Sequence, residues 1–476
     1  AAAREPGRCQ AKAFTALGMH YLARGERARA EKCLRRALAA DASEGEAGEA
    51  LLSLLRGSGD GGNAAAIAEA EAIHTEAPDV AWAARACGRG RLVSGDAEGA
   101  LTPLQSALRT QPTHAPTWEA LASAYEALGR IGAAQRALAR ARQLRASLDA
   151  QSRGPFASTR AGNLALSLAE LTEAEALHRE ALEASPAHPP ALLGLAVVLL
   201  QRARNDARGG APTRAALALK EAAEAAAEAA KGRGHLLTAW KTLGDIMRSH
   251  EAVTPAPGTL DLVDAKAEET QDPVQRELRA QACAARAYAK AVHVNPANAL
   301  LRSDLALAHA AEARLHELHT IPGAMLRVGE LMHDAERLII GALRLNPAAP
   351  ELWAALASCS HDIDKKENGL ARALTLAPRD ADAWAALGRV YLSAGQTEPA
   401  VRALEQARGA DPGNAAAWLA TALLYRRQNR DELGAFSMAA TLRAGPEADL
   451  GFAQAAVAKG PAGGGGPAYA AARRAA

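Results

Sequence analysis

Tryptophan recurs at a fixed distance along the C-terminal part of the chain. Trp384 and Trp418 are 34 residues apart, and Trp353 precedes Trp384 by 31 residues. In four places a proline precedes a tryptophan by six residues: Pro112 and Trp118, Pro347 and Trp353, Pro378 and Trp384, and Pro412 and Trp418. A signal that returns with a period of about 20 to 50 residues indicates stacked copies of one supersecondary unit. This repetition limits the possible folds more than any other feature of the sequence.

The window that begins at Trp384 carries a complete repeat pattern. Its marked positions are Trp384, Leu387, Gly388, Tyr391, Ala400, Leu404, Ala407 and Pro412. This pattern resembles the tetratricopeptide repeat, a helical hairpin of about 34 residues. We expect Gly388 and Ala400 to be small because the two helices of the hairpin cross there at close range. Pro412 should end the unit, because proline cannot continue a helix.

Further units follow the same pattern along the chain. The expected structural anchors of the repeats are Phe14, Trp82, Trp118, Trp240, Trp353, Trp384 and Trp418. The composition agrees, because hydrophobic residues make up 49% but aromatic residues only 3%, whereas strands favour aromatic and β-branched side chains. We predict an all-α, right-handed superhelical solenoid of tetratricopeptide repeats. The first helices of the hairpins should line its concave face, which is the usual binding surface of a solenoid.

Irregularities in the period divide the chain into five segments. Residues 1–150 and 278–448 are predicted to form tetratricopeptide repeats, and residues 151–250 repeats with elongated helices. A second pair of lengthened helices is expected from Leu300 to Pro347. Residues 251–277 form a Pro-rich acidic insertion, and connections of this length are usually functional or disordered. Residues 449–476 should be a flexible Gly/Ala-rich tail.

Charge, cysteine content and hydropathy exclude several classes of protein. The chain has 55 Lys and Arg residues and 53 Asp and Glu residues, so its formal net charge is only +2. A net charge this small does not favour strong direct binding of nucleic acid. The five cysteines lack CxxC spacing, which favours reduced thiols over a disulfide framework or a zinc site. No apolar run approaches the roughly 18 residues of a membrane span. The chain begins with Ala, so we expect a fragment or a trimmed chain, and its expected location is the cytoplasm, with the nucleus as a further option.

The sequence offers no convincing catalytic, cofactor or metal site. His309, His316 and His319 share a helical face, but no ligand from a second helix is evident, so solvated or core histidines are the favoured interpretation. The glycine runs at 57–62 and 463–466 lack the Lys-Ser/Thr that a phosphate-binding loop needs. We therefore expect a protein that is not an enzyme and binds no cofactor.

Three arginines are the candidate partner-binding residues. Arg389, Arg426 and Arg427 lie on first helices of the two most regular units, where they should face or rim the concave groove. Basic clusters near residues 24–36 and 136–145 are more simply explained as solvated helix faces balanced by Glu. The Lys and Asn pattern that chaperone-binding repeats use to hold a terminal carboxylate is missing from the units after Trp353, Trp384 and Trp418.

The order of units from Phe14 to about Gly451 resembles the scaffold subunits of Superkiller complexes. The likeness lies in segments such as "GDAEGALTPLQSALRTQPTHAPTWEALASAYEALGR", and in lengthened helices and an insertion at matching places. The resemblance implies a non-catalytic scaffold that joins a DExH-box RNA helicase and WD-repeat subunits, and through them serves the cytoplasmic exosome. The family's propeller-binding motif needs an aromatic residue at the fourth position after Gln. The three Gln-Arg pairs, Gln135-Arg136, Gln201-Arg202 and Gln275-Arg276, are followed there by Ala139, Asn205 and Arg279, so none matches and no propeller site is placed on this chain.

Two other functions fit a repeat array of this kind. The first is a generic tetratricopeptide adaptor, similar to a co-chaperone, that holds a peptide in its groove. The second is the repeat domain of a protein glycosyltransferase that lacks its catalytic half. The second ranks last, because such domains line their groove with asparagine and Asn is sparse on the first helices here.

Overall fold

The fold was analysed in a computed structural model that describes residues 5–57, 62–145, 154–232, 236–251, 273–319, 325–442 and 446–458. Within these ranges the chain forms 23 α-helices and one short 3-10 helix, and no strand. It divides into two compact units, residues 1–195 and 196–476, and the division falls within one helix. Each unit is described by itself.

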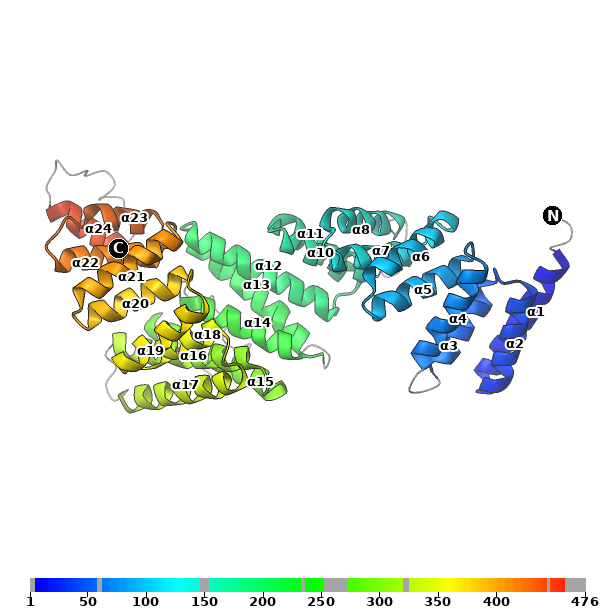
Figure 1. The fold of residues 1–476 in the computed structure, drawn as a ribbon, viewed down its shortest axis with the longest axis horizontal. Helices are drawn as coiled ribbons and strands as arrows, with labels where there is room; N and C mark the ends of the chain where they lie inside the picture. The colour runs from blue at the N-terminus through cyan, green and yellow to red at the C-terminus, as the bar shows by residue number, and fades with distance from the viewer. Residues whose placement is uncertain are drawn as a thin grey trace. The chain divides into compact units, whose positions relative to one another are not determined.

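Unit 1 is a row of helical hairpins (Figure 1). Its helices are α1 (Glu5–Ala23), α2 (Arg27–Ala40), α3 (Gly45–Arg56), α4 (Gly62–Glu76), α5 (Ala81–Val93), α6 (Ala97–Thr110), α7 (Ala115–Ala127), α8 (Ile131–Arg145), α10 (Phe156–Ser167) and α11 (Leu171–Ala184), followed by the start of α12 (Pro189–Arg208). Consecutive helices pack in pairs, α1 with α2, α3 with α4 and so on to α10 with α11. The first helices of neighbouring hairpins also contact each other: α3 packs against α5, and α5 packs against α7.

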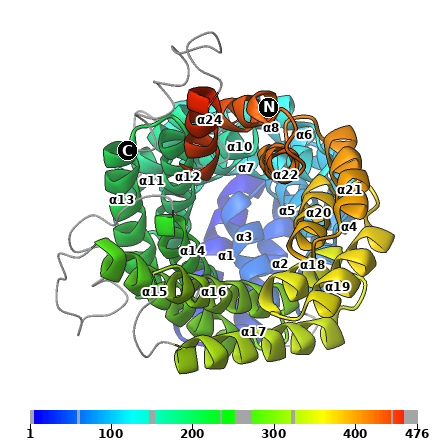
Figure 2. The same ribbon diagram turned by 90° about the vertical axis from the view of Figure 1, so that its left-hand side faces the viewer.

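Unit 2 contains the rest of α12 and twelve further α-helices among its described residues. These are α13 (Pro212–Ala230), α14 (Leu236–Arg248), α15 (Pro273–Val294), α16 (Ala299–Leu318), α17 (Met325–Leu345), α18 (Pro350–Cys359), α19 (Ile363–Leu376), α20 (Ala381–Ser393), α21 (Thr397–Ala410), α22 (Ala415–Arg427), α23 (Leu433–Thr441) and α24 (Pro446–Ala458). The hairpins are α14–α15, α16–α17, α18–α19, α20–α21 and α22–α23. Figure 2 shows their first helices on the inner side of an arc and α15, α17, α19 and α21 on its outer side.

A hydrogen bond explains the six-residue spacing between proline and tryptophan. The indole Nε1 of Trp384 donates to the carbonyl oxygen of Pro378 at 2.9 Å. The same bond, at 2.8 to 2.9 Å, joins Trp118 to Pro112, Trp353 to Pro347 and Trp418 to Pro412. Arg302 replaces tryptophan in one unit, and its Nε donates to the carbonyl oxygen of Pro296 at 2.9 Å. Each bond fixes the end of one hairpin to the first helix of the next.

Small residues stand where the helices of a hairpin cross, as the sequence predicts. Ala400 on α21 is fully buried. A Cβ on Gly388 of α20 would lie 2.7 Å from side-chain carbons of Leu404, which is closer than two carbon atoms can approach. The small side chains therefore allow the close helix contact on which each hairpin depends.

Several helices are long in the regions where the sequence predicts lengthening. Their lengths are 20 residues in α12, 19 in α13, 20 in α16 and 21 in α17. Helix α20 of a regular unit has 13 residues. Helix α15 has 22 residues and begins at Pro273, so the last five residues of the predicted 251–277 insertion are helical. Proline is favourable at a helix start, where its missing N–H needs no partner. The rest of the insertion, residues 252–272, lies outside the described residues.

The expected tail begins later than residue 449. Helix α24 continues to Ala458 and packs against α23. The packing is tight, because Phe436 is fully buried and a Cβ on Gly451 would lie 2.3 Å from its ring. Apolar burial of this kind outweighs the weak helix propensity of the segment. Residues 459–476 lie outside the described part of the chain.

Trp82 lies in a different register from Trp118. Gly88 packs on Leu104 as Gly388 packs on Leu404, which puts Ala84 in the position that Trp384 holds in its unit. Trp82, two residues earlier, is 3% exposed and its ring lies against Gly48 of α3. Its Nε1 donates to the carbonyl oxygen of Ala42 at 2.9 Å. Trp82 therefore joins neighbouring hairpins through a contact of its own.

A histidine occupies the core of the α10–α11 hairpin. His178 on α11 follows Ala174 by four residues, as Leu404 follows Ala400, and its side chain is fully buried. Its ring lies between Gly162 of α10 and Gly194 of α12, where an added Cβ would come within 2.8 and 2.1 Å of it. Neither ring nitrogen has a hydrogen-bond partner in the described ranges. Burial lowers the pKa of His178 from the ordinary 6.5 to about 4, so the ring is neutral at pH 7.

His178→Leu should make stability less dependent on pH. Between pH 6.5 and 4 the unfolded chain binds a proton at His178 that the folded chain does not. The free energy of unfolding therefore decreases as the pH is lowered through this range, by about 3 kcal/mol in total. Leucine cannot bind a proton and fills the same core position in other units. Urea unfolding at pH 7.5 and 4.5, followed by circular dichroism, measures the difference. The exposed His20→Leu is the control, and an unchanged pH dependence in His178→Leu would contradict the assignment.

Ala169→Gly should stabilise unit 1. Ala169, in the turn between α10 and α11, has a φ of 61°, whereas glycine holds the corresponding left-handed position in other turns, for example Gly129 and Gly395. The left-handed conformation costs a non-glycine residue about 1–2 kcal/mol, and part of the gain is lost to the freedom of glycine in the unfolded chain. The expected net gain is about 0.5–1 kcal/mol in urea unfolding.

Ala176→Gly is the matched control for this substitution. Ala176 is exposed within α11, so glycine there should destabilise by about 1 kcal/mol. Equal effects of the two substitutions would show that the turn carries no strain.

Candidate protein-interaction surface

The three arginines predicted to bind a partner differ in their contacts within the protein. Arg426 on α22 bonds to Glu432 at 2.9 Å, and its guanidinium carbon lies 4.6 Å from the centre of the Phe436 ring. Arg427 donates to the carbonyl oxygen of Leu392 near the end of α20. Arg389 on α20 is exposed and has no hydrogen bond or ion pair within the described residues. Of the three, Arg389 is thus the cation that remains available to a partner.

A buried polar cluster joins α14, α15 and α16, and sequence reasoning did not find it. The hydroxyl of Tyr288, fully buried on α15, donates to Asp245 Oδ1 at 2.7 Å. Burial and the nearby Asp245 raise the pKa of Asp304, while Lys241 and Arg248 oppose this shift. Lys290 Nζ lies 3.9 Å from the centre of the Trp240 ring. The Tyr288–Asp245 hydrogen bond links α15 to α14, and the charges of Asp245, Lys241 and Arg248 act on Asp304 of α16.

In unit 1, three arginines of α3 and α5 form what we call the arginine row: Arg56, Arg85 and Arg89. The Arg85 side chain is only 9% exposed, and its guanidinium bonds to Glu49 of α3 at 2.8 Å and to Gln111. Next to the row, Arg145 of α8 pairs with Glu119 of α7 at 2.8 Å. Both glutamates close to the row are therefore already bound to an arginine.

Arg56 and Arg89, unlike Arg85, have no ion pair or hydrogen bond in the described part of the chain. Arg89 is exposed on α5. Burial, and then the charge of Arg85, lower the pKa of Arg89, with Arg56 acting in the same direction and Glu49 and Glu119 opposing. Burial and the charges of Arg85, Arg89 and Arg145 likewise lower the pKa of His114. Among the groups that act on Arg89 and His114, arginines thus outnumber glutamates.

The basic cluster near residues 136–145 is partly neutralised. Arg142 pairs with Glu180 at 2.5 Å and Arg145 with Glu119 at 2.8 Å, whereas Arg140 bonds to the neutral amide of Gln143 at 2.7 Å. Arg136 is exposed and has no partner among the described residues. These contacts agree with the simple explanation that the sequence favours, a solvated helix face balanced by acidic groups.

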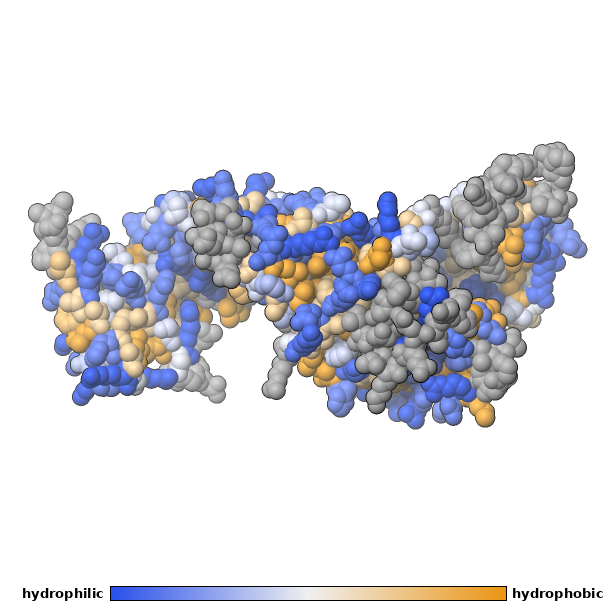
Figure 3. Space-filling model, turned by 180° about the vertical axis from the view of Figure 1, so that it is seen from behind, coloured by the Kyte–Doolittle hydropathy of each residue, from blue (hydrophilic) through white to orange (hydrophobic). Residues whose placement is uncertain are grey.

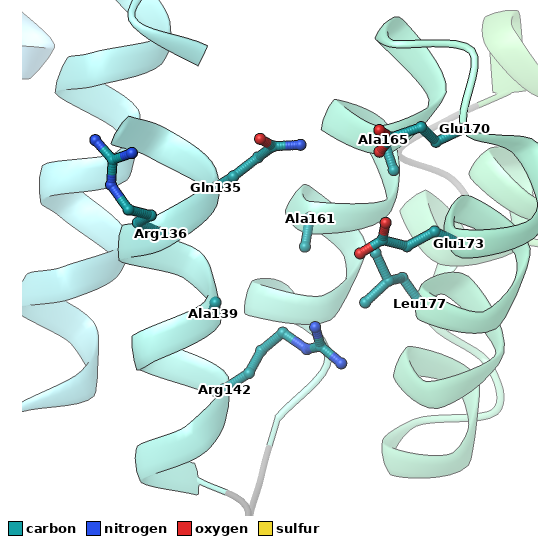
Figure 4. A pocket seen from close by; sticks show the side chains of 9 residues that line it. All are labelled: Gln135, Arg136, Ala139, Arg142, Ala161, Ala165, Glu170, Glu173 and Leu177. Carbon is teal, nitrogen blue, oxygen red and sulfur yellow. The ribbon is translucent and has the colours of Figure 1, made fainter. Parts of the chain in front are cut away.

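A pocket of about 320 Å³ opens between α8 and the α10–α11 hairpin. Figure 4 shows Gln135, Ala139 and Arg142 of α8 on one side of the pocket and Ala161, Glu170 and Glu173 on the other. The guanidinium of Arg136 points away from the two glutamates. Ala139 is not aromatic, so the Gln135-Arg136 pair does not match the propeller-binding motif, and the pocket is assigned no ligand.

Metal and membrane sites were also sought in the described residues. They contain no group of three or more His, Cys, Asp or Glu side chains placed to hold a metal ion. His309 lies on α16 with His316, and burial lowers the pKa of His309. No helix in the described ranges is both long and apolar enough to cross a membrane. Figure 3 shows hydrophilic residues over much of one face, with small apolar groups between them.

Comparison with known proteins supports the repeat assignment. Residues 368–432 match the family model described as tetratricopeptide repeat. A solved tetratricopeptide repeat protein from Parabacteroides merdae is 14% identical, with 60% of this chain and 93% of that chain covered and a TM-score of 0.42. The chain is an all-α tetratricopeptide-repeat solenoid. The right-handed sense of its superhelix stays a prediction.

Two curated relatives cover most of the chain. Tetratricopeptide repeat protein 37 of Xenopus laevis is 26% identical over 422 residues, which are 87% of this chain and 26% of the relative. Superkiller complex protein 3 of Mus musculus is 24% identical over 454 residues, 93% of this chain and 28% of the relative. The resemblance to Superkiller scaffold subunits is thus confirmed. The chain spans about a quarter of the length of these relatives.

Proposed function

We propose that the chain is a non-catalytic scaffold similar to the Superkiller subunit. In this role it holds a DExH-box RNA helicase and WD-repeat subunits in a cytoplasmic assembly that passes messenger RNA to the exosome for 3′-to-5′ decay. The observation that carries the proposal is the similarity to two such relatives over 87% and 93% of the chain, far beyond a single repeat. The near-balance of charge supports it, because the scaffold can leave RNA binding to the helicase.

The structure supports a binding role through its arrangement of hairpins. In unit 2 the first helices lie along the inner side of an arc, which offers a continuous surface to a protein chain (Figure 2). Arg389 lies on one of these helices and has no hydrogen bond or ion pair to any residue that the structure describes. We therefore assign Arg389 to the contact surface for a subunit of the assembly, whereas Arg426 and Arg427 support the fold.

Affinity purification from the native organism, followed by mass spectrometry, tests the function. The tagged full-length gene product should recover a DExH-box helicase and WD-repeat proteins in comparable amounts. A tetratricopeptide protein of similar length from the same cells serves as the control bait. Recovery of chaperones alone would favour the adaptor function, and recovery of glycosylated clients the glycosyltransferase function. Failure to recover any helicase subunit would overturn the scaffold proposal.

Arg389→Glu should weaken the binding of one subunit at least tenfold, because a reversed charge at an interface costs on the order of 1–3 kcal/mol. Arg372→Glu is the matched control, since Arg372 is also exposed but lies on α19 at the outer side of the arc. The amount of each subunit recovered per bait measures the effect. Equal recovery by the two variants would remove Arg389 from the contact surface.

A further inference from the structure

The arginine row of unit 1 lies on the first helices of two neighbouring hairpins. Arg85 and Arg89 are one helical turn apart on α5, so they share a face of that helix. Arg56 is the last residue of α3, the first helix of the preceding hairpin, and α3 packs against α5. The contact between α3 and α5 brings Arg56 to the same part of the surface, and the charges of Arg56 and Arg85 both lower the pKa of Arg89, after burial.

The charges at this place do not cancel. Arg85 is bound to Glu49, and Arg145 is bound to Glu119. No further acidic group is among the main electrostatic influences on Arg89, and Arg56 has neither an ion pair nor a hydrogen bond within the described residues. Two exposed guanidinium groups are thus without a counter-charge among the described residues. Charge-assisted, two-bond hydrogen bonds to a carboxylate are the strongest polar contact that a partner can offer them.

We propose that the arginine row binds an extended acidic segment of a partner protein, with a carboxylate on Arg89 and a second carboxylate on Arg56. Arginine suits this task because its planar guanidinium matches a carboxylate in a two-bond, fork-like geometry. Arg85 is already held by Glu49 and Gln111, so Arg56 and Arg89 are the groups of the row that the segment would bind.

Carboxylates fit this surface better than the phosphates of a nucleic acid. Glu49 and Glu119 flank the row, and Glu49 is 64% exposed on its side chain. A nucleic-acid backbone, with a charge on each nucleotide, would pass these glutamates and be repelled by them. A polypeptide can place single carboxylates opposite the two free arginines and neutral residues opposite the glutamates. The binding mode does not depend on the partner being a subunit of a Superkiller-like assembly.

Fluorescence anisotropy with the full 476-residue chain tests the proposal. The probe is a fluorescein-labelled peptide of about ten residues that alternates Glu with Gly and Ser, and its control has Gln at every Glu. We expect micromolar binding of the Glu peptide at about 50 mM salt, weaker binding at about 300 mM, and none of the Gln peptide. Oligouridine of about ten nucleotides tests the nucleic-acid alternative.

Arg89→Glu should weaken peptide binding at least tenfold, and Arg56→Glu should weaken it less. Arg36→Glu makes the same change in net charge on an exposed arginine of α2, a second helix of its hairpin, and should leave binding unchanged. Arg89→Lys keeps the charge but loses the fork geometry, so it should give an intermediate affinity even if Arg89→Glu fails to fold.

Three results would overturn the proposal. The first is an absence of binding of the Glu peptide to the unmodified chain. The second is an equal loss of affinity in Arg36→Glu and Arg89→Glu, which would indicate attraction by net charge alone. The third is binding of oligouridine, but not of the Glu peptide, that depends on Arg89.

Discussion

The hydrogen bond from an indole to a proline carbonyl six residues earlier sets the stacking of the regular hairpins. Proline ends the second helix of one hairpin, and its carbonyl oxygen has no partner within that helix. Tryptophan on the next first helix supplies the missing donor, as Trp384 does for Pro378. Arg302 supplies the same donor to Pro296, so the requirement is for an N–H at that place and not for an indole as such. Because the bond joins neighbours only, the array can lengthen or vary one hairpin without changing the next.

Close helix contact places a second constraint on the sequence, and it explains the abundance of small residues. A large side chain on one helix requires a glycine or alanine on the helix that it meets. Leu404 meets Gly388, whereas the ring of His178 requires a glycine on both α10 and α12. Trp82 requires Gly48 in the same way. Residue size is therefore set pairwise between helices, and a change at one site is tolerated only with a matching change at its neighbour.

The sequence predicted the fold class because its signals are local. Spacing within one unit is enough to identify the hairpin, its crossing point and its end. The register of Trp82 could not be predicted from its distance to Trp118. Equivalent positions of the first two units, Phe14 and Gly48, are 34 residues apart, whereas Gly48 and its equivalent Ala84 are 36 residues apart. The repeat length thus changes by two residues in the unit before Trp82. The contacts of Arg427 and the availability of Arg89 depend on packing between hairpins, which one unit's pattern does not contain. The shift in pKa of His178 likewise follows from glycines on two other helices.

Contacts between side chains also distinguish the arginines that support the fold from those that remain available to a partner. Several arginines on the first helices are neutralised within the protein, for example Arg85 by Glu49, Arg160 by Glu126, and Arg426 by Glu432. An ion pair of this kind contributes little net stability at the surface, but it removes a charge that would otherwise attract many partners. Arg56 and Arg89 in unit 1 and Arg389 in unit 2 differ from these, because they have no such partner among the described residues. A scaffold that must recognise specific proteins gains selectivity from few free charges on a largely neutral surface, because a partner must place its own charge opposite them.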